Sequence, residues 1–327
     1  MYRHSSLLIA IMVVALSACQ TEGPHRVLRV GHTLDTNHSV HQALQHMAER
    51  LVIYSNGQLQ LKLYPNGQLG SERDMVELLQ IGSLAMTKVS AASLEGFVSE
   101  MRVFGVPYLF RSDEHRWRVL ESAIGEEILR ATRPARFTGL AYMDAGSRSF
   151  YMTESMVSVP EDVQGKKVRV MNSPMAVQLI DTMQGAATPM AWGELYAALQ
   201  QGVVDGAENN PPSYYSSRHY EIAKHYSLNE HASIPDVIII SNHVLNSLNS
   251  KERRWLERAM DDAVRKQRQL WEQAEQQALA RLAEAGVTIT RPDKAPFYKA
   301  VEPLHQRLSD SAVGPLMQRI KSMGVSQ

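Results

Sequence analysis

The sequence predicts an α/β protein whose two lobes form a clamshell, and three observations support this prediction. Strand-like and helix-like segments alternate along 27–81, which is typical of a sheet covered by helices. A second segment of the same kind occupies 159–241. From Ser250 to Ala285 there is no glycine or proline, and apolar residues recur at helical spacing, so we expect a helix roughly 50 Å long at 1.5 Å per residue. A helix of that length is expected to brace both lobes.

The elements of the first lobe follow from short alternating strands and from helices with apolar residues three or four positions apart. Gly57 and Gly82 end the two earliest helices, and a turn lies at 65–67. In chain order we expect a strand at 27–31, a helix at 38–55, a strand at 59–64, a helix at 72–81, a helical stretch at 113–130 and a strand at 137–143.

The elements of the second lobe show the same alternation. Ser173 is a plausible N-cap for a helix that has Pro174 in its first position. In chain order we expect a strand at 167–171, a helix at 173–183, a helix that contains Leu195 and Leu199 and closes at Gly202, a short strand at 203–207 and a fully apolar strand at 237–241.

The division into domains follows from these two segments and from the long helix. The segments are not separated by a proline- or serine-rich linker, so the chain is expected to cross between the domains on continuous strands. We expect a discontinuous first domain at 27–146 and 235–272, and a second at 147–234 and 273–327. Ligands of such sheets bind in the crevice beyond the carboxyl ends of the strands.

The first residues are typical of a bacterial export signal and not of the fold. The apolar run at 7–16 is about half as long as a membrane-spanning helix needs to be. Small residues then precede Cys19, in a pattern that resembles a lipobox. We therefore expect 1–18 to be a lipoprotein signal peptide, Cys19 to carry lipid, and 19–26 to be a tether at the outer side of a bacterial membrane.

Composition excludes several function classes. Lys and Arg together number 34, as do Asp and Glu, and this balance offers no electrostatic surface for nucleic acid. The single cysteine cannot form an internal disulfide or a cysteine-based metal cage. The sequence also lacks GxSxG, HExxH, CxxC and a glycine-rich phosphate loop, so we expect no cofactor and no metal.

Polar residues at the ends of strands are the candidates for a binding site. In the segment KVRV the two valines share one face, so Arg169 points to the other, where a guanidinium suits capture of a carboxylate. Arg148 follows the expected strand at 137–143. A third polar group at a strand end consists of Glu208, Asn209 and Asn210. The alternatives are a surface arginine held in a salt bridge and, for the asparagines before two prolines, an ordinary turn.

Longer stretches of the sequence resemble the DctP family, the solute-binding proteins of tripartite ATP-independent periplasmic (TRAP) transporters. They are GKKVRVMNSPM, ATPMAWGELYAALQQGVVDGAENN, YPNGQLGSERDMVELLQIGSLAMT and VPYLF. The resemblance extends over 27–320 and implies a receptor that closes two lobes around its ligand by a hinge motion, without catalysis. It also implies two membrane partners, one small and one large integral subunit of the transporter.

The resemblance assigns roles to individual residues. Arg169 matches the arginine that pairs with the ligand carboxylate in this family, and Arg148 matches the second basic residue of the pocket. Asn209 matches the asparagine beside that carboxylate, and Glu72 matches an acidic residue of the first lobe. The lipobox at Cys19 departs from the common pattern, because most members are free periplasmic proteins.

The segment from Glu208 to His231 looks like the subgroup that binds hexuronates such as glucuronate and galacturonate. A uronate has one carboxylate for the arginines and several hydroxyls for polar side chains. The residues expected to hold the hydroxyls or to stack on the sugar ring are Glu72, Glu208, Asn209, Asn210, His38, Trp192 and Tyr215.

Three alternatives remain open at this point. A C4-dicarboxylate would need a second cationic pole, which Lys88 could supply. A ligand-sensing receptor for a histidine kinase would have the same fold. An enzyme acting on uronates would need an acid/base pair or a metal near the carboxylate, and the sequence shows no such constellation.

Overall fold

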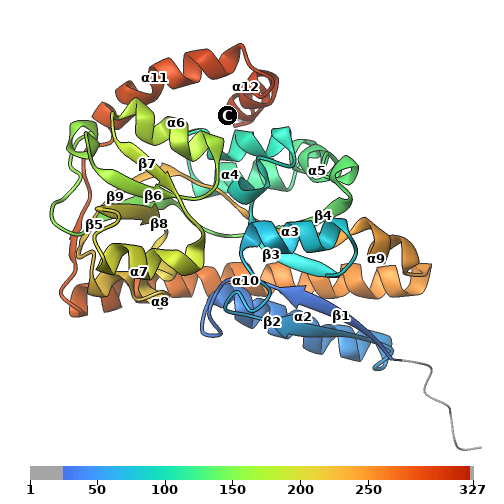
Figure 1. The fold of residues 1–327 in the computed structure, drawn as a ribbon. Coiled ribbons are helices and arrows are strands. Elements are labelled where there is room, and N and C mark those ends of the chain that lie inside the picture. Colours follow the sequence, from blue (N-terminus) through green and yellow to red (C-terminus); the bar gives the residue numbers. More distant parts are fainter. Residues whose placement is uncertain (1–24, 325–327) are drawn as a thin grey trace, which may run out of the picture.

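The computed structural model describes residues 25–324, which form two lobes, each built around one β-sheet (Figure 1). The predicted signal peptide at 1–18 and the predicted lipidation site Cys19 lie outside the described residues. Within 25–324, no helix has both the length and the apolar character that crossing a membrane requires. The clamshell of two α/β lobes that the sequence predicts is confirmed.

The sheet of the first lobe has five strands in the order β2-β1-β3-β10-β4. β1 runs parallel to β2 and β3, whereas β10 is antiparallel to both of its neighbours. β10 is fully buried, as its apolar sequence predicts. The strands are β1 (Arg26–Gly31), β2 (Leu59–Tyr64), β3 (Met86–Ser90), β4 (Phe137–Met143) and β10 (Asp236–Ser241).

The sheet of the second lobe has six strands in the order β11-β9-β5-β8-β6-β7. β6 is parallel to β7 and β8, and β5 is antiparallel to β8 and β9. The strands are β5 (Arg148–Met152), β6 (Lys167–Val170), β7 (Ala186–Pro189), β8 (Gly206–Asn209), β9 (His225–Ala232) and β11 (Thr288–Thr290).

Helices cover both sheets. Those of the first lobe are α2 (Ser39–Ser55), α3 (Glu72–Gln80), α4 (Asp113–Leu120), α5 (Ala123–Arg130) and α9 (Asn242–Ser247), with 3-10 turns η2 (Ala91–Leu94), η3 (Ser99–Gly105) and η4 (Arg133–Ala135). Those of the second lobe are α6 (Pro174–Thr182), α7 (Leu195–Gln200) and α8 (Pro211–Ser216), with 3-10 turns η5 (Pro160–Val163), η6 (Trp192–Glu194) and η7 (His219–Glu221). The chain ends with α10 (Ser250–Glu284), α11 (Ala295–Ser309) and α12 (Gly314–Ser322).

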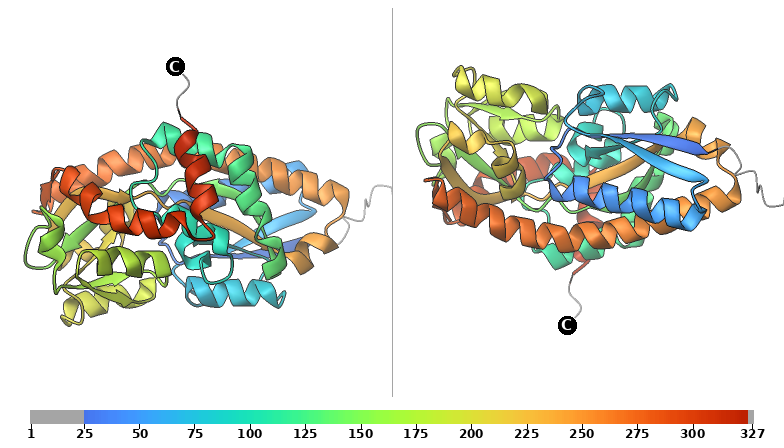
Figure 2. Two further views of the ribbon diagram at one scale, coloured as in Figure 1. Left: turned by 90° about the horizontal axis from the view of Figure 1, so that it is seen from above. Right: turned by 90° about the horizontal axis from the view of Figure 1, so that it is seen from below.

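The long helix predicted from Ser250 onward is present as α10, and it runs along both lobes (Figure 2). A capping box between Asn249 and Glu252 begins it. It packs on α2 in the first lobe and on α8 in the second. Gln267, fully buried at its middle, accepts a hydrogen bond from the amide of Asp144 and donates one to the carbonyl of the same residue, both at 2.8 Å. The helix is thereby fixed to the crossing from β4 to β5.

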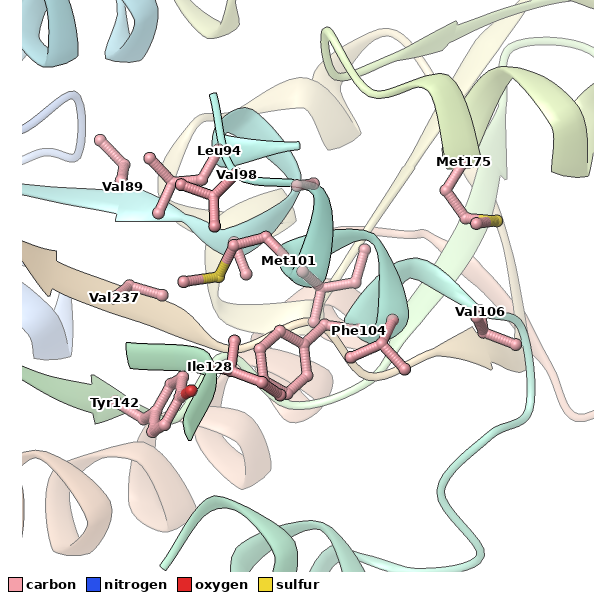
Figure 3. Close-up of a cluster of buried hydrophobic side chains, with 14 of the residues drawn as sticks. Val89, Leu94, Val98, Met101, Phe104, Val106, Ile128, Tyr142, Met175 and Val237 are labelled. Atoms are coloured by element: carbon pink, nitrogen blue, oxygen red, sulfur yellow. The ribbon is translucent and has the colours of Figure 1, made fainter. Parts of the chain in front are cut away.

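The largest hydrophobic cluster is the core of the first lobe, and it also receives side chains from elsewhere (Figure 3). Met175, which projects from α6 of the second lobe, packs in this cluster with Phe104 and Leu94 of the first. Residues of α11 and α12 also belong to it, among them Leu304 and Met317. The second-domain range 273–327 remains a prediction, but the packing of α12 is with the first lobe.

Several sequence predictions are wrong in detail. The helical stretch at 113–130 is two helices, because Ser122 caps a new helix after Glu121. The strand predicted at 203–207 is β8, which starts three residues later, so Glu208 and Asn209 lie within the strand and not beyond it. β5 and β9 are not predicted from the sequence, because their polar and buried residues do not alternate cleanly.

Candidate functional site

A cavity lies between the two lobes, with about 910 Å³ of space between its walls, counting the part open to solvent. Both sheets and α10 contribute to its lining, which is rich in charged and amide side chains. Eight of the ten predicted site residues line it, namely His38, Glu72, Lys88, Arg148, Arg169, Trp192, Asn209 and Asn210.

Arg169 reaches the cavity because of the alternation of β6. Val168 and Val170 are fully buried in the core of the second lobe, so the arginine between them projects from the opposite face. Its Nε and Nη2 atoms donate to the carbonyl oxygen of Met190 at 3.0 and 2.7 Å, and its guanidinium lies 5.7 Å from the ring centre of Trp192. Burial lowers the pKa of Arg169, but a guanidinium stays protonated at neutral pH.

Arg148 begins β5 and is bound to the acidic side chain next to it in the sheet. Its guanidinium donates to both carboxylate oxygens of Glu208 and, at 3.0 Å, to Oδ1 of Asn209. His231 Nε2 lies 3.4 Å from the same carboxylate. Burial alone would raise the pKa of Glu208, but the charge of Arg148 outweighs it and holds this pKa at about 2. Arg148 and Glu208 are therefore a neutralised buried pair.

On the first-lobe side, Lys88 stands between two carboxylates. Its ammonium lies 3.2 Å from Asp236 Oδ1 and 3.3 Å from Glu72 Oε1. Burial alone would lower the pKa of Lys88, but the charges of Asp236 and Glu72 reverse this and keep it above its usual value. Glu72 also accepts a hydrogen bond from Ser93 Oγ at 2.6 Å. This wall therefore presents fixed hydrogen-bonding groups and no free cation among the described residues.

His38 contributes a neutral ring to the cavity. Its Nδ1 accepts a hydrogen bond from the amide of Val40 at 3.2 Å and so caps α2. This bond leaves the proton on Nε2, which lies 3.3 Å from Ser213 Oγ of the second lobe. Burial, together with the charge of Lys88, lowers the pKa of His38 to about 3. The ring packs 5.9 Å from that of Trp271, which lines the cavity from α10.

Two predicted residues do not line the cavity. Tyr215 stacks on Tyr220 at 5.5 Å between ring centres, outside the cavity, because α8 turns that side chain toward η7. Glu208 is bound by Arg148 and His231, and its side chain is not part of the cavity lining. The structure therefore does not bring these two side chains to the cavity with the other eight, although Glu208 holds the neighbouring Arg148 in place.

The sequence reasoning missed other residues of the lining. Asp236 is an acidic residue at the start of an apolar strand, and that contrast is the signal that could have identified it. Trp271 was expected only as part of the apolar face of the long helix, although it lies where α10 passes the cavity. Within the part of the chain that the structure describes, no three potential metal-ligating side chains come together.

Comparison with known proteins gives the family. Residues 30–311 match the family described as bacterial extracellular solute-binding protein, family 7, or DctP. The chain belongs to the DctP family. Its members bind solutes outside the cytoplasm and serve TRAP transporters, as the sequence resemblance implied.

Solved TRAP periplasmic solute-binding proteins have the same fold over almost their whole length. One from Xanthobacter autotrophicus, with bound β-D-galacturonate, is 36% identical and has a TM-score of 0.87, covering 91% of this chain and 100% of that one. One from Chromohalobacter salexigens, with bound D-glucuronate, is 34% identical with a TM-score of 0.88 and the same coverage. One from a Polaromonas species, bound to D-erythronate, is 28% identical with a TM-score of 0.89, covering 92% and 100%.

Proposed function

We propose that this receptor binds a hexuronate, of the D-glucuronate or D-galacturonate type, in the cavity between its lobes and releases it unchanged to a TRAP permease. The observation that carries the proposal is the absence, within residues 25–324, of a carboxylate partner for Arg169. Among the described cations of the cavity it alone has no carboxylate partner, since its guanidinium bonds the carbonyl of Met190 and otherwise lies beside the ring of Trp192. A buried guanidinium is stabilised when an anion joins it, so the cavity is suited to one carboxylate.

The remaining lining suits hydroxyl groups. Asn209 and Asn210 offer amide donors and acceptors in the second lobe, while Glu72 and Asp236 offer carboxylate oxygens in the first. Trp192, beside Arg169, offers an apolar face to a sugar ring. The bound galacturonate and glucuronate of the two similar structures above have this combination of one carboxylate and several hydroxyls.

A dicarboxylate fits this charge arrangement less well. Lys88, the candidate for a second cationic pole, is already paired with Glu72 and Asp236. A second ligand carboxylate would have to displace one of these carboxylates or lie beside both. Two carboxylates in contact in a buried site repel each other, and this repulsion costs several kcal/mol of binding free energy. The lining thus supports a monoacid.

Delivery to the membrane completes the proposal. The partners are the small and large integral subunits of the transporter, which recognise the closed, ligand-bound receptor. We further propose that the chain is a periplasmic lipoprotein, cut before Cys19 and anchored by lipid on that cysteine. The apolar run at 7–16 and the small residues before Cys19 support the anchor.

A thermal-shift screen of the chain without residues 1–19 tests the ligand. A ligand that binds only the folded state adds about 2.7 kcal/mol of stability at 100 times its Kd. We expect a shift with glucuronate or galacturonate and none with succinate or malate. A shift with the diacids alone would overturn the uronate proposal and leave the family intact.

A further inference from the structure

A buried carboxylate outside the ligand cavity connects the two lobes. Glu95 follows η2 in the first lobe, and its side chain is 1% exposed. Oε1 accepts a hydrogen bond from Ser173 Oγ at 2.8 Å, and Oε2 accepts one from the amide of Met175 at 3.1 Å. Ser173 and Met175 form the first turn of α6 in the second lobe. One carboxylate thus receives both of its hydrogen bonds from the opposite lobe.

These contacts adjoin the ligand cavity, because neighbours in sequence on both sides of the contact line it. On the first-lobe side, Ser93 and Gly96 flank Glu95 in sequence, and both line the cavity. On the second-lobe side, Met171 and Asn172 line it immediately before Ser173. The strand that bears Arg169 ends at Val170, so only two residues, Met171 and Asn172, separate that strand from the turn that Glu95 holds. A shift of the α6 N-terminus would be transmitted to Arg169 over this short connection.

The packing around the carboxylate is close. A Cβ atom at Gly105 would lie 2.9 Å from Glu95 Oε1 and 2.9 Å from Cβ and Cγ of Met175, so only glycine fits between them. Figure 3 shows Met175 on a different segment of chain from Leu94 and Phe104, in whose cluster it packs. The contact is therefore specific to this approach of the two lobes.

We propose that Glu95 is a positioning residue that latches the two lobes together and holds the segment from Arg169 to α6 in its ligand-binding position. When the lobes part, Glu95 loses both hydrogen bonds and becomes hydrated, and the first turn of α6 loses a partner from the other lobe. The latch thereby favours the closed form in which the cavity is complete. Only the affinity measurement below rests on the proposed uronate ligand.

The latch also makes closure depend on pH. Burial raises the pKa of Glu95 to about 7 from an ordinary value of 4.5, against the hydrogen bonds from Met175 and Ser173 and the charge of Arg102, which lower it. Glu72 bonds Ser93 and not Glu95, and the one charged residue of α6, Asp181, lies in its last turn. The closed form therefore holds a proton that the open form releases between about pH 4.5 and 7, so closure weakens as pH rises through this window.

The first test measures ligand affinity by calorimetry at pH 5.5 and 7.5. For the wild type we expect glucuronate affinity to fall roughly twentyfold between these values, since one pKa unit corresponds to tenfold. Glu95→Gln keeps the shape without the ionisation, so its affinity should be equal at both pH values and match the wild type at pH 5.5. Glu95→Ala, which removes both hydrogen bonds, should bind more weakly at both.

A matched control separates this effect from others. Glu100→Gln removes a carboxylate on η3 whose hydrogen bond is to its neighbour Ser99, and it should keep the wild-type pH profile. Burial also raises the pKa of Glu275 on α10 to about 7, so the difference between wild type and Glu95→Gln is the decisive quantity. A Glu95→Gln profile as steep as that of the wild type overturns the proposal. So do variants that lower only the melting temperature and leave affinity unchanged, which is the result for a static interface.

The second test needs no ligand and so stays informative if the uronate proposal fails. Exposed Ile81, after α3, and Gln201, after α7, lie on opposite lobes, and a chain without Cys19 has no other cysteine. Nitroxide labels at Ile81→Cys and Gln201→Cys report the distance between the lobes. We expect the short-distance population to be larger at pH 5.5 than at 7.5, and equally large at both in Glu95→Gln. Populations that do not change with pH in the wild type overturn the latch.

Discussion

At the scale of single residues, the charges of the cavity differ in whether the protein already satisfies them. Arg148 and Lys88 are each bound to carboxylates of the chain. Arg169 has the carbonyl of Met190 and the ring of Trp192 as its described partners, and it is 2% exposed. A buried guanidinium that keeps hydrogen-bonding capacity in a cavity is the strongest determinant of what the cavity accepts.

Replacement of Arg169 should therefore remove most of the affinity for a carboxylate ligand. Loss of one partner of a buried charge pair costs about 2–5 kcal/mol, which corresponds to roughly 30- to several-thousandfold in Kd. Arg169→Ala should show this loss by calorimetry, and Arg169→Lys should recover only part of it, because an ammonium cannot bond Met190 and the ligand in a planar fork. Arg73→Ala is the control, since Arg73 lines the cavity but pairs with Glu77 at 3.0 Å. Unchanged affinity in Arg169→Ala would contradict the assignment.

Buried neutral histidines make the fold sensitive to acid. Burial lowers the pKa of His219 to about 3 from 6.5, with the charge of Arg169 acting in the same direction. Below pH 6.5 the unfolded chain binds a proton that the folded chain does not, so this stability is complete above pH 6.5 and is lost as pH falls toward 3. When the pH falls from 6.5 to 5, the free energy of unfolding measured in urea should fall in the wild type by about 2 kcal/mol more than in His219→Gln. His46→Gln, half-exposed on α2, should behave as the wild type.

At the scale of elements, α10 not only covers the lobes but also fixes the crossing from β4 to β5. Gln267 satisfies both the amide and the carbonyl of Asp144 where the chain leaves β4 for the second lobe. The side chain of Asp144 in turn accepts a hydrogen bond from Arg116 of α4 at 2.7 Å and one from Trp117 at 3.1 Å. The crossing from β4 to β5 is thus held between α4 and α10.

Gln267→Leu should destabilise the fold because it leaves two buried backbone groups without partners. Each unsatisfied group costs about 1–3 kcal/mol, so we expect the free energy of unfolding measured in urea to fall by about 2–6 kcal/mol. Gln276→Leu, on an exposed part of the same helix, should change stability by less than about 0.5 kcal/mol. Equal stabilities of the two variants would show that Gln267 does not hold the crossing.

At the scale of the whole molecule, two lobes, two sheet crossings and one bracing helix form a receptor of the DctP family. The first lobe supplies Lys88 with its two carboxylates, and the second supplies both the Arg148–Glu208 pair and Arg169, which has no carboxylate partner in the described part of the chain. Because residues of both lobes line the cavity, a ligand that contacts both would bind the closed form better, which is the condition for a ligand-driven closure.

The proposed membrane anchor concerns the location of the whole molecule, and its test is a change in location. Cys19→Ser should move the protein from the membrane fraction to the soluble periplasmic fraction, because serine lacks the thiol that would carry the lipid. Immunoblots of the two fractions measure the shift. A serine variant that stays with the membrane would count against the lipoprotein proposal.

The sequence by itself determined the fold class, most elements and the central arginine. Strands at 59–64 and 137–143 and the helix from Ser250 are as predicted, because the periodicity of side chains along one segment is a local property. The face that Arg169 presents followed from the two valines beside it. Polar residues near strand ends indicated Arg148, Asn209 and Asn210, and the family resemblance added Glu72, His38 and Trp192.

Only the tertiary structure decided which charged side chains of the cavity have a partner of opposite charge. Lys88 and Asp236 are 148 positions apart, and Arg148 and Glu208 are 60 apart, so no local pattern could show that they pair. Tyr215 lies in the predicted segment of sequence, yet the direction of α8 turns it to Tyr220. Strand order and helix direction bring distant side chains together, and they depend on the packing of the whole chain rather than on the sequence near each residue.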